Sequence, residues 1–469
     1  MACPSCLPAR TGRITILGLL VLIAGFLAFQ SDAILTERKP GGDAQLVSAQ
    51  TLPEMDGALC EWAPASASVA LQASLQEGGS ARTGVLSESG RAAAAGRSPI
   101  RTLGDVYSVF SAVAVDAVRN EVVMTDENLF SLLVYDRREN TPPAARMTEP
   151  KRMIRGLNTL LEFQCSLYVD PANGDIYAVN NDTMNRLVIF SRQARGNVAP
   201  DRFLETPHTT FGIAVHEESQ EMLLTIQDDG AVVTYPKSAP GAEPPIRLLQ
   251  GVRTLLADPH GIAIDSKKDL GYGSNWGTVN SRRVPPGQPR LEGESGSRPA
   301  HPHEPVGRVQ AVPGSGRFLP PSITVYPRTA SGDAAPAQLI QGPKTQLNWP
   351  TALAIDPERR ELFVANDTGD SVVVFSADAT GDVPPLRVLK GPKTLIKNPT
   401  GVFFDQKNNE LWVTNFGNHT ATVYKPTASG DTPPLRVIRS APLNTPAPML
   451  GNPHVVAYDT KREEILVAT

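Results

Sequence analysis

The sequence predicts an all-β fold, a seven-bladed β-propeller of four-stranded blades, and two observations carry this prediction. First, the 469 residues include 42 Pro and 38 Gly, too many for long helices and typical of frequent turns between short strands. Second, a two-strand motif with a fixed internal spacing recurs along the chain, which is the signature of a repeat fold. Because repeat folds grow by adding units, length alone does not set the number of domains.

The repeat is plainest in residues 350–366 and 399–415, where two short strands flank a polar turn. The first strand ends at Asp116, Asp170, His216, Asp265, Asp356, Asp405 and Asp459. The second strand ends ten residues later each time, at Asp126, Asn180, Ile226, Asn275, Asn366, Asn415 and Thr469. Seven equal spacings predict seven repeats.

A third and a fourth strand follow in most repeats. The third strand ends on an aromatic residue, at Tyr135, Phe190, Tyr235, Tyr326, Phe375 and Tyr424. The fourth carries a polar residue two positions before an Ile or Leu, at Arg152, Arg202, Arg247, Gln338, Arg387 and Arg436. The step between these two positions is 12 residues in five repeats and 17 in the first. We interpret the recurring Arg as a rim residue whose stem packs on the neighbouring strand.

The last repeat ends after its second strand, at the final residue Thr469. Candidates for its missing third and fourth strands stand at the other end of the chain, at Val85-Leu86 and Arg101-Thr-Leu103. We therefore expect the ring to close by pairing of N-terminal strands, about 83–104, with C-terminal strands, about 454–469. Such closure would remove the free strand edges of an open array.

Four segments follow from the pattern of composition. Residues 1–33 form a signal peptide or membrane anchor, because the apolar run 14–29 follows Arg10 and Arg13 and precedes the small residues Ser31 and Ala33. This run of 16 residues lies between a signal-peptide core and the roughly 20 residues of a spanning helix, so cleavage stays open. Residues 34–82 read as a flexible linker. Residues 83–469 are the propeller, with 277–321 as an inserted low-complexity loop.

Charge and cysteine content narrow the classes of partner. The chain has 44 Lys and Arg against 48 Asp and Glu, a formal charge of -4, so no basic field favours a nucleic acid. Contact with a membrane is expected only through residues 14–29, if they are not cleaved. The four cysteines are Cys3, Cys6, Cys60 and Cys165. Whether Cys60 and Cys165 form a disulfide stays open, and disulfides are not expected to hold the fold together.

The motifs Trp412-Val-Thr-Asn415 and Phe363-Val-Ala-Asn366, each preceded by Pro-x-Gly/Ala and a hydrophobic strand ending in Asp, resemble the NHL and YVTN families of β-propeller repeats. The resemblance covers roughly residues 83 to 469 and implies the propeller fold. Those families include binding scaffolds, surface proteins, lactonases and a copper- and zinc-dependent lyase. The resemblance therefore implies no single activity.

The candidate ligand site is the channel mouth, the face shared by the fourth-to-first and second-to-third connections of a propeller. The residues expected there are Cys165, His260, Asn275, Thr351, Asn366, Thr400, Asn415 and His454. The strand-end Asn residues also have a structural interpretation, because Asn caps turns by bonding nearby backbone amides. Cys165 is equally explained as a small buried residue, since nothing in the sequence places a base beside it. Whether a metal is bound stays unknown.

These observations favour an exported cell-envelope propeller, periplasmic or extracellular and either released or anchored in the inner membrane, that binds a protein or a glycan. The alternative is a lactonase-like hydrolase or lyase with a metal held at the channel mouth by some of His260, His454, Asn275, Asn366 and Asn415. A structural surface component is a third reading. No phosphate-binding loop or nucleophile elbow occurs in the repeats, so enzymatic activity stays uncertain and no cofactor is identified.

Overall fold

The computed structural model describes residues 105–181, 184–279, 281–283, 301–305, 308–310 and 317–447, with the backbone of 456–459 and 464–467. The regular elements of these residues are strands and single 3-10 turns. None of these elements is a helix long and apolar enough to cross a bilayer. The predicted signal or anchor 1–33, the linker 34–82, the strands near 83–104 and His454 lie outside the described residues.

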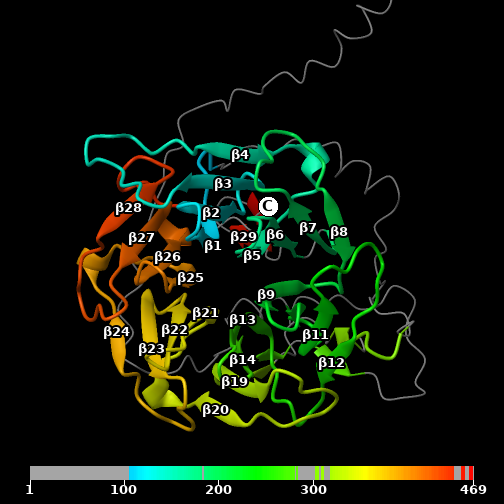
Figure 1. Cartoon of the computed structure of the whole chain (residues 1–469). Helices are drawn as coiled ribbons and strands as arrows, with labels where there is room; N and C mark the ends of the chain where they lie inside the picture. Colours follow the sequence, from blue (N-terminus) through cyan, green and yellow to red (C-terminus); the bar gives the residue numbers. More distant parts are fainter. Residues whose placement is uncertain are drawn as a thin grey trace, which may run out of the picture. The chain divides into compact units, whose positions relative to one another are not determined.

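Six antiparallel four-stranded sheets form the blades (Figure 1), and each is built from consecutive strands except blade 4, where β15 to β18 lie between its second and third strands. Blades 1 to 3 comprise β1 (Phe110–Asp116), β2 (Glu121–Asp126), β3 (Ser131–Asp136), β4 (Arg152–Arg155), β5 (Gln164–Val169), β6 (Ile176–Asn180), β7 (Arg186–Phe190), β8 (Arg202–Glu205), β9 (Thr210–His216), β10 (Glu221–Ile226), β11 (Ala231–Pro236) and β12 (Arg247–Gln250). Blades 4 to 6 comprise β13 (Pro259–Asp265), β14 (Leu270–Asn275), β19 (Ser322–Pro327), β20 (Gln338–Gln341), β21 (Pro350–Asp356), β22 (Glu361–Asn366), β23 (Ser371–Ser376), β24 (Arg387–Leu389), β25 (Pro399–Asp405), β26 (Glu410–Asn415), β27 (Thr420–Tyr424) and β28 (Arg436–Arg439). The 3-10 turns are η1 (Leu157–Thr159), η2 (Pro343–Thr345), η3 (Pro392–Thr394) and η4 (Phe416–Asn418).

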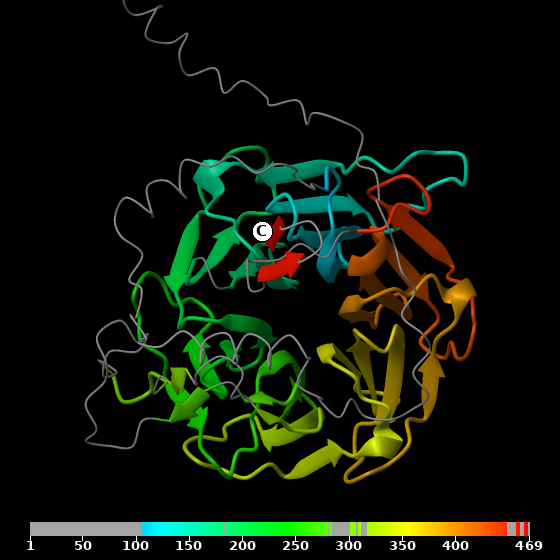
Figure 2. The same cartoon turned by 180° about the vertical axis from the view of Figure 1, so that it is seen from behind.

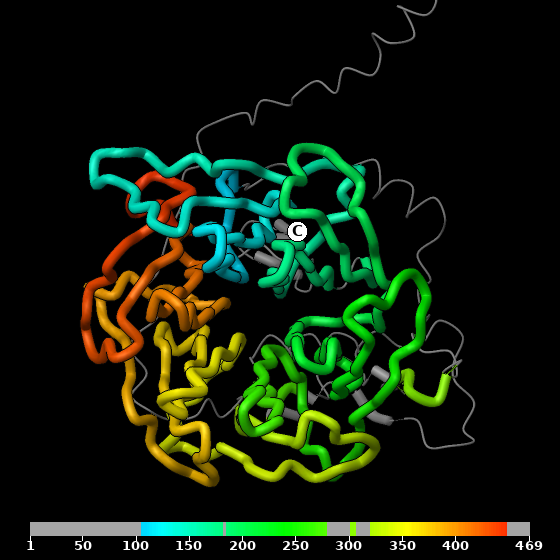
Figure 3. Tube along the Cα trace, in the orientation of Figure 1, coloured from blue at the N-terminus to red at the C-terminus, as the bar shows by residue number. Residues whose placement is uncertain are grey.

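The predicted seventh blade is wrong, because blades 1 and 6 pack directly against each other. The innermost strands β1 and β25 are in contact, and Trp412 and Ile438 of blade 6 share one buried cluster with Phe110 and Tyr135 of blade 1. Figures 2 and 3 show the chain passing once round the ring, so that its first and last blades become neighbours. With these two apolar faces covered by each other, no gap remains for a further blade.

The expected closure by pairing strands of about 83–104 with strands of about 454–469 is therefore also wrong. At the C-terminal end, β29 (Val456–Asp459) and β30 (Glu464–Val467) pair with each other in a separate two-stranded sheet. Their register, with Asp459 opposite Glu464, is that of the first two strands of a blade, such as Asp116 opposite Glu121. The repeat motif thus continues past the last blade without adding one to the ring.

Five of the six outer strands are tied to the next blade by a glycine in the connection between that blade's third and fourth strands. The bridged pairs are Ile154–Gly196, Leu204–Gly241, Leu249–Gly332, Ile340–Gly381 and Leu389–Gly430. The φ angles of these glycines lie between 57° and 83°, a region that a Cβ disfavours. At the junction of blades 6 and 1 the longer connection of blade 1 takes this role. There the amides of Thr141 and Thr148 donate to the carbonyls of Val437 and Arg439.

A second set of contacts at this junction joins the segment before β1 to blade 6. His419 is fully buried, with Nδ1 2.8 Å from the Ser108 carbonyl and Nε2 3.1 Å from Asp105 Oδ2. The Ser440 hydroxyl donates to the same Ser108 carbonyl at 2.6 Å. Because both nitrogens of His419 face acceptors, the arrangement suits the doubly protonated imidazolium. The first and last blades are thus held by a buried ion pair as well as by apolar packing.

The innermost strands approach so closely that a small residue is needed near their start. In blade 4 the Gly261 amide donates to Ser274 Oγ at 2.9 Å, and this hydroxyl donates to the Thr351 carbonyl of blade 5 at 3.1 Å. A Cβ on Gly261 would lie 2.3 Å from the Thr351 oxygen. Gly212 meets the His260 carbonyl in the same way. Glycine at these positions of blades 3 and 4 is therefore required by blade-to-blade packing.

Four of the five recurring Arg residues of the fourth strands form ion pairs on the rim, whereas Arg202 of blade 2 donates to the carbonyls of Lys237 and Ala239. Arg387 binds Glu361 through both guanidinium Nη atoms at 2.7 Å. The equivalent pairs are Arg152–Glu121, Arg247–Glu221 and Arg436–Glu410. Blade 4 lacks this pair, because Leu270 takes the place of the Glu and Gln338 takes the place of the Arg. These Arg residues thus link the fourth strand to the second strand of their own blade.

Between β14 and β19 the insertion adds no strand to blade 4, but it contains short strand pairs of its own. Here β15 (Thr278–Val279) pairs with β18 (Arg317–Phe318), and β16 (Ser281–Arg283) pairs with β17 (Arg308–Gln310). The Leu319 amide donates to the Gly277 carbonyl at 2.8 Å, so both ends of the insertion are fixed at the blade.

Replacing residues 279–317 by Asn-Gly should leave the ring folded, because Thr278 already faces Phe318 across a ladder that a two-residue turn can close. We expect the free energy of unfolding to change by about 1 kcal/mol or less. Thermal unfolding followed by far-UV circular dichroism, with size-exclusion chromatography, tests this. A shortened chain that aggregates or melts without cooperativity would show that the insertion supports the blades.

Candidate ligand site at the channel mouth

The channel mouth is built from two loops per blade that one backbone hydrogen bond holds together. In every blade, the amide of the residue after the second strand donates to the carbonyl of the residue before the first strand. The six pairs are Glu127–Val109, Asn181–Phe163, Gln227–Thr209, Trp276–Asp258, Asp367–Trp349 and Phe416–Asn398. Two rings of side chains, one from each loop, are therefore brought to the same face of the ring.

The predicted strand-end residues Asn275, Asn366 and Asn415 are buried, with 2% exposure or less, and their side chains order these loops. Asn366 Oδ1 accepts from the Asn348 amide at 2.6 Å, while its Nδ2 donates to the Gln346 carbonyl at 3.0 Å. Asn275 accepts in the same way from the Ala257 amide, and Asn415 from the Lys397 amide. The turn-capping interpretation of these residues matches the hydrogen bonds.

The other predicted residues lie at the start of the innermost strands. Thr400 Oγ1 donates to the Ser111 carbonyl of blade 1 at 2.8 Å. The Thr351 hydroxyl is buried and donates to the Trp349 carbonyl at 3.2 Å. Cys165 is half-buried, with Sγ 3.4 Å from the Phe163 carbonyl. Cys60, its proposed disulfide partner, lies outside the described residues.

His260 takes part in a directional hydrogen-bond chain that fixes its tautomer. Asn181 Nδ2 donates to Gln227 Oε1 at 2.7 Å, which leaves Gln227 Nε2 to donate to His260 Nε2, also at 2.7 Å. The opposite nitrogen, Nδ1, carries the proton and donates to the Asp258 carbonyl at 3.0 Å. Burial lowers the pKa of His260 to about 3, so the ring is neutral near pH 7. Its lone pair is already engaged by Gln227.

An aromatic row extends from this histidine across blades 3, 4 and 5. Phe211 and His260 have ring centroids 4.3 Å apart, and His260 stacks on Trp276 at 3.6 Å and 13°. Trp276 in turn stacks on Trp349 at 4.4 Å and 27°. The inner rings are buried or partly buried, whereas Trp349 is 40% exposed. The row therefore ends in an indole that faces solvent.

Two carboxyl groups of the same loops have raised pKa values. Burial, together with the charges of Asp126 and Asp367, raises the pKa of Glu127 to about 7, while a hydrogen bond from Ser111 opposes the shift. Burial also raises the pKa of Asp367 to about 6, although Asn398 Nδ2 donates to its Oδ1 at 3.1 Å. Both groups therefore change protonation close to neutral pH.

Sequence reasoning missed several residues that form the aromatic row and the hydrogen-bonded loops of the channel mouth. Gln227, Trp276 and Asp367 each stand one position after the end of a second strand, and Trp349 stands one position before a first strand. The repeat spacing marked the strand ends themselves, which carry the loop-capping Asn residues. These residues could have been found by comparing the loop positions next to the strand ends across all blades. A position with a purely structural role would repeat one residue type in every blade, whereas these positions vary.

The metal predicted by the alternative function has no ready set of ligands here. Within residues 105–447 as far as they are described, no three His, Cys, Asp or Glu side chains are grouped so that they could hold a metal ion. His260 and the strand-end Asn side chains are engaged as described above. The second predicted histidine, His454, lies outside the described residues.

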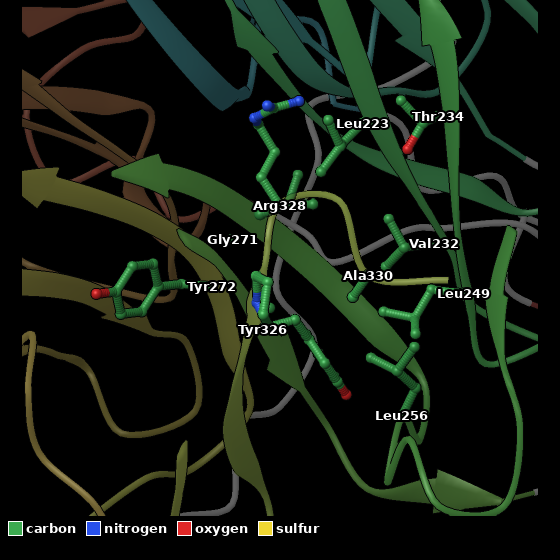
Figure 4. A pocket seen from close by; sticks show the side chains of 13 residues that line it. Leu223, Val232, Thr234, Leu249, Leu256, Gly271, Tyr272, Tyr326, Arg328 and Ala330 are labelled. Atoms are coloured by element: carbon green, nitrogen blue, oxygen red, sulfur yellow. The ribbon is translucent and has the colours of Figure 1, made fainter. Parts of the chain in front are cut away.

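A separate apolar hollow lies between blades 3 and 4 (Figure 4). It measures about 400 Å³ including space open to solvent, and Leu223, Leu249 and Tyr326 contribute to its walls. It exists because β14 has Gly271 and Gly273 where β22 of blade 5 has Leu and Val. In Figure 4 the Arg328 side chain is directed away from Leu249 and Tyr326, and its guanidinium binds Glu221 and Asp269. The lining is thus mainly apolar, with Thr234, Arg328 and two tyrosines as its polar residues.

Comparison with known proteins assigns no family to this chain. No protein family and no curated protein sequence matches the chain. Among solved structures, Kuenenia stuttgartiensis hydrazine synthase is 11% identical with a TM-score of 0.45, covering 71% of this chain and 99% of its own. A chain from a nidogen/laminin complex is 12% identical with a TM-score of 0.36, covering 72% and 83%. The chain is a β-propeller, and its assignment to the NHL and YVTN repeats stays a prediction.

Proposed function

We propose that this chain is an exported cell-envelope propeller that binds a protein or glycan ligand at its channel mouth. The observation that carries this proposal is the aromatic row ending in Trp349. A ligand that covers this indole would bury apolar surface that the folded chain leaves exposed to solvent. The apolar run at residues 14–29 supports a periplasmic or extracellular location, with or without an inner-membrane anchor.

Trp349 occupies a backbone position that does not favour a tryptophan. Its φ is 53°, in the left-handed region, where Asn, Asp and Gly are the common residues. Positive φ recurs at the equivalent positions of blades 2, 3, 4 and 6, at Phe163, Thr209, Asp258 and Asn398, so this backbone conformation belongs to the repeat. Trp349 differs from Phe163 and Thr209 in its exposure, because Phe163 is partly buried and Thr209 is buried. The exposed indole supports a role in recognition.

The neighbouring groups keep this surface rigid. The chain of hydrogen bonds through Asn181, Gln227 and His260 fixes the inner part of the row, on which Trp276 stacks. A rigid surface binds with a smaller loss of side-chain entropy than a mobile one. Because the lone pair of His260 is engaged by Gln227, this side chain is suited to a positioning role and not to proton transfer or metal binding.

Retention of ligand from an envelope extract of the source organism on the immobilised full chain tests the proposal. We expect Trp349→Ala to reduce the retained material at least tenfold. Leu386→Ala removes a 56% exposed apolar side chain from a connection between third and fourth strands, away from the mouth, and should change nothing. Equal retention by the parent and Trp349→Ala, or no retention by the parent, would refute a ligand site at this mouth.

A further inference from the structure

We infer that the ligand of the channel mouth is a carbohydrate, whose pyranose ring stacks on Trp349 while exposed amides of the same loop bind its hydroxyls. This inference rests on the function proposed above and names the chemical class of the ligand. The ligand would contact the segment Gln346-Leu347-Asn348-Trp349, which leads from η2 into β21.

The indole of Trp349 offers one flat apolar surface. Trp276 covers one of its faces at 4.4 Å, and 40% of Trp349 remains exposed, which places the accessible surface on the opposite side. Among the exposed large apolar side chains of the described residues, Trp349 is the only aromatic one. The C–H face of a pyranose is matched to such an isolated, rigid ring, because stacking buries apolar area without requiring a pocket.

The polar groups beside this ring are amides. Gln346 and Asn348 are exposed, and their backbone atoms bind Asn366, which fixes the loop that carries their side chains. A side-chain amide has one acceptor and two donor hydrogens, so it can bind two adjacent hydroxyls of a sugar at once. Leu347 between them points into the protein and is buried. The loop therefore anchors itself through Leu347 and Asn366 and presents Gln346, Asn348 and Trp349 to solvent.

A protein partner would be recognised differently. The central residue of a protein interface is usually surrounded by a shell of contacts that excludes water. The exposed residues that precede Trp349 in the loop, Gln346 and Asn348, are polar, and the adjacent Asp367, whose amide binds the Trp349 carbonyl, is a carboxyl residue. Polar side chains around a single aromatic ring match a hydroxylated ligand better than an apolar protein surface. We therefore assign the glycan, and not the protein, to this site.

The chemistry of the retained material decides the inference. Material bound from the extract by the full chain is treated with periodate, which cleaves vicinal diols, or with a broad-specificity protease, and is then offered again. We expect periodate to abolish binding and protease to leave it. Binding that survives periodate and is lost after protease would overturn the carbohydrate assignment while leaving the proposed binding function intact. Absence of any retained material would instead count against the proposed function.

Titration with defined sugars tests the roles of the three residues. Chitohexaose, cellohexaose and maltohexaose are titrated into the full chain and followed by calorimetry. We expect at least one to bind, Trp349→Ala to weaken its binding tenfold or more, Trp349→Phe to restore part of it, and Asn348→Ala to weaken it severalfold. The matched control is Leu395→Ala, an exposed residue in the equivalent loop of blade 6. Binding that is the same in the parent, Trp349→Ala and Asn348→Ala would overturn the assignment to this loop.

Discussion

Replacing Gly261 with Val is expected to destabilise the ring by about 3 kcal/mol, more than a typical substitution in a strand. A Cβ at this position would lie 2.3 Å from the Thr351 oxygen and 2.8 Å from the Ala352 Cα. Both atoms belong to the backbone of the next blade, so no side-chain rotation can relieve the contact. The substitution would also disturb the hydrogen bonds of Ser274 that join the two blades.

The matched control lies in the same blade. A Cβ on Gly273 would meet its nearest neighbour, Thr324 Oγ1, at 3.5 Å, an ordinary van der Waals distance. Gly273→Ala should therefore stabilise the protein by about 0.5 kcal/mol, because it removes chain entropy from the unfolded state and fills part of the hollow between blades 3 and 4. The midpoint of urea unfolding measures both variants. If the two substitutions shifted it equally, the close approach of the blades would not be the reason for the glycine.

Replacing His419 with Gln is expected to cost about 3 kcal/mol at pH 6, because it leaves the buried Asp105 carboxylate without its cation. Burial lowers the pKa of His419, but the Asp105 carboxylate and the Ser108 carbonyl outweigh it, so the pKa of the folded state is raised above 6.5. A raised pKa gives stability that is fully present below 6.5 and is lost as pH rises through the folded value. The difference between the parent and His419→Gln should therefore shrink from pH 6 to pH 9.

Urea unfolding of both proteins at the two pH values checks this dependence. His208→Gln is the control, since His208 is exposed and its Nδ1 lies 3.0 Å from Asn185 Oδ1, and it should change stability little at either pH. A difference between the parent and His419→Gln that is equal at pH 6 and pH 9 would show that His419 is neutral in the folded ring. The contact between His419 and Asp105 would then be a hydrogen bond between a neutral imidazole and a carboxyl group, and not an ion pair.

The strands of the blades could be predicted from the sequence because their markers have local physical causes. Asp356, for example, ends a first strand because its Oδ1 accepts from the amides of Glu358 and Arg359 in the next turn. Such contacts lie within a few residues, so they recur wherever the motif does. The number of blades could not be predicted in the same way. It depends on whether blade 1 packs against blade 6, and the hairpin of β29 and β30 has the motif without joining the ring.

The site was predicted only in outline. The repeat placed the predicted residues on one face of the ring, His260 among them, but it emphasised Asn366 and its equivalents, whose amides bind the backbone of the loops. Trp276 and Trp349 are 73 residues apart in sequence, with the insertion between them, so their stacking could not be inferred from spacing. The residues proposed to bind the ligand differ from blade to blade. A search for recurring residues therefore does not identify them.

The closed ring has one further consequence, for where such a chain can begin and end. Every blade is one continuous segment, and blades 1 and 6 meet through side chains and loop contacts without exchanging a strand. Both ends of the described ring also contact the segment around η4, since Asp105 pairs with His419 and the Ala447 amide donates to the Gly417 carbonyl. The break in the covalent chain therefore falls between two whole blades, as each of the other five junctions does. We expect such a propeller to tolerate circular permutation at another junction, with the proposed binding surface unchanged.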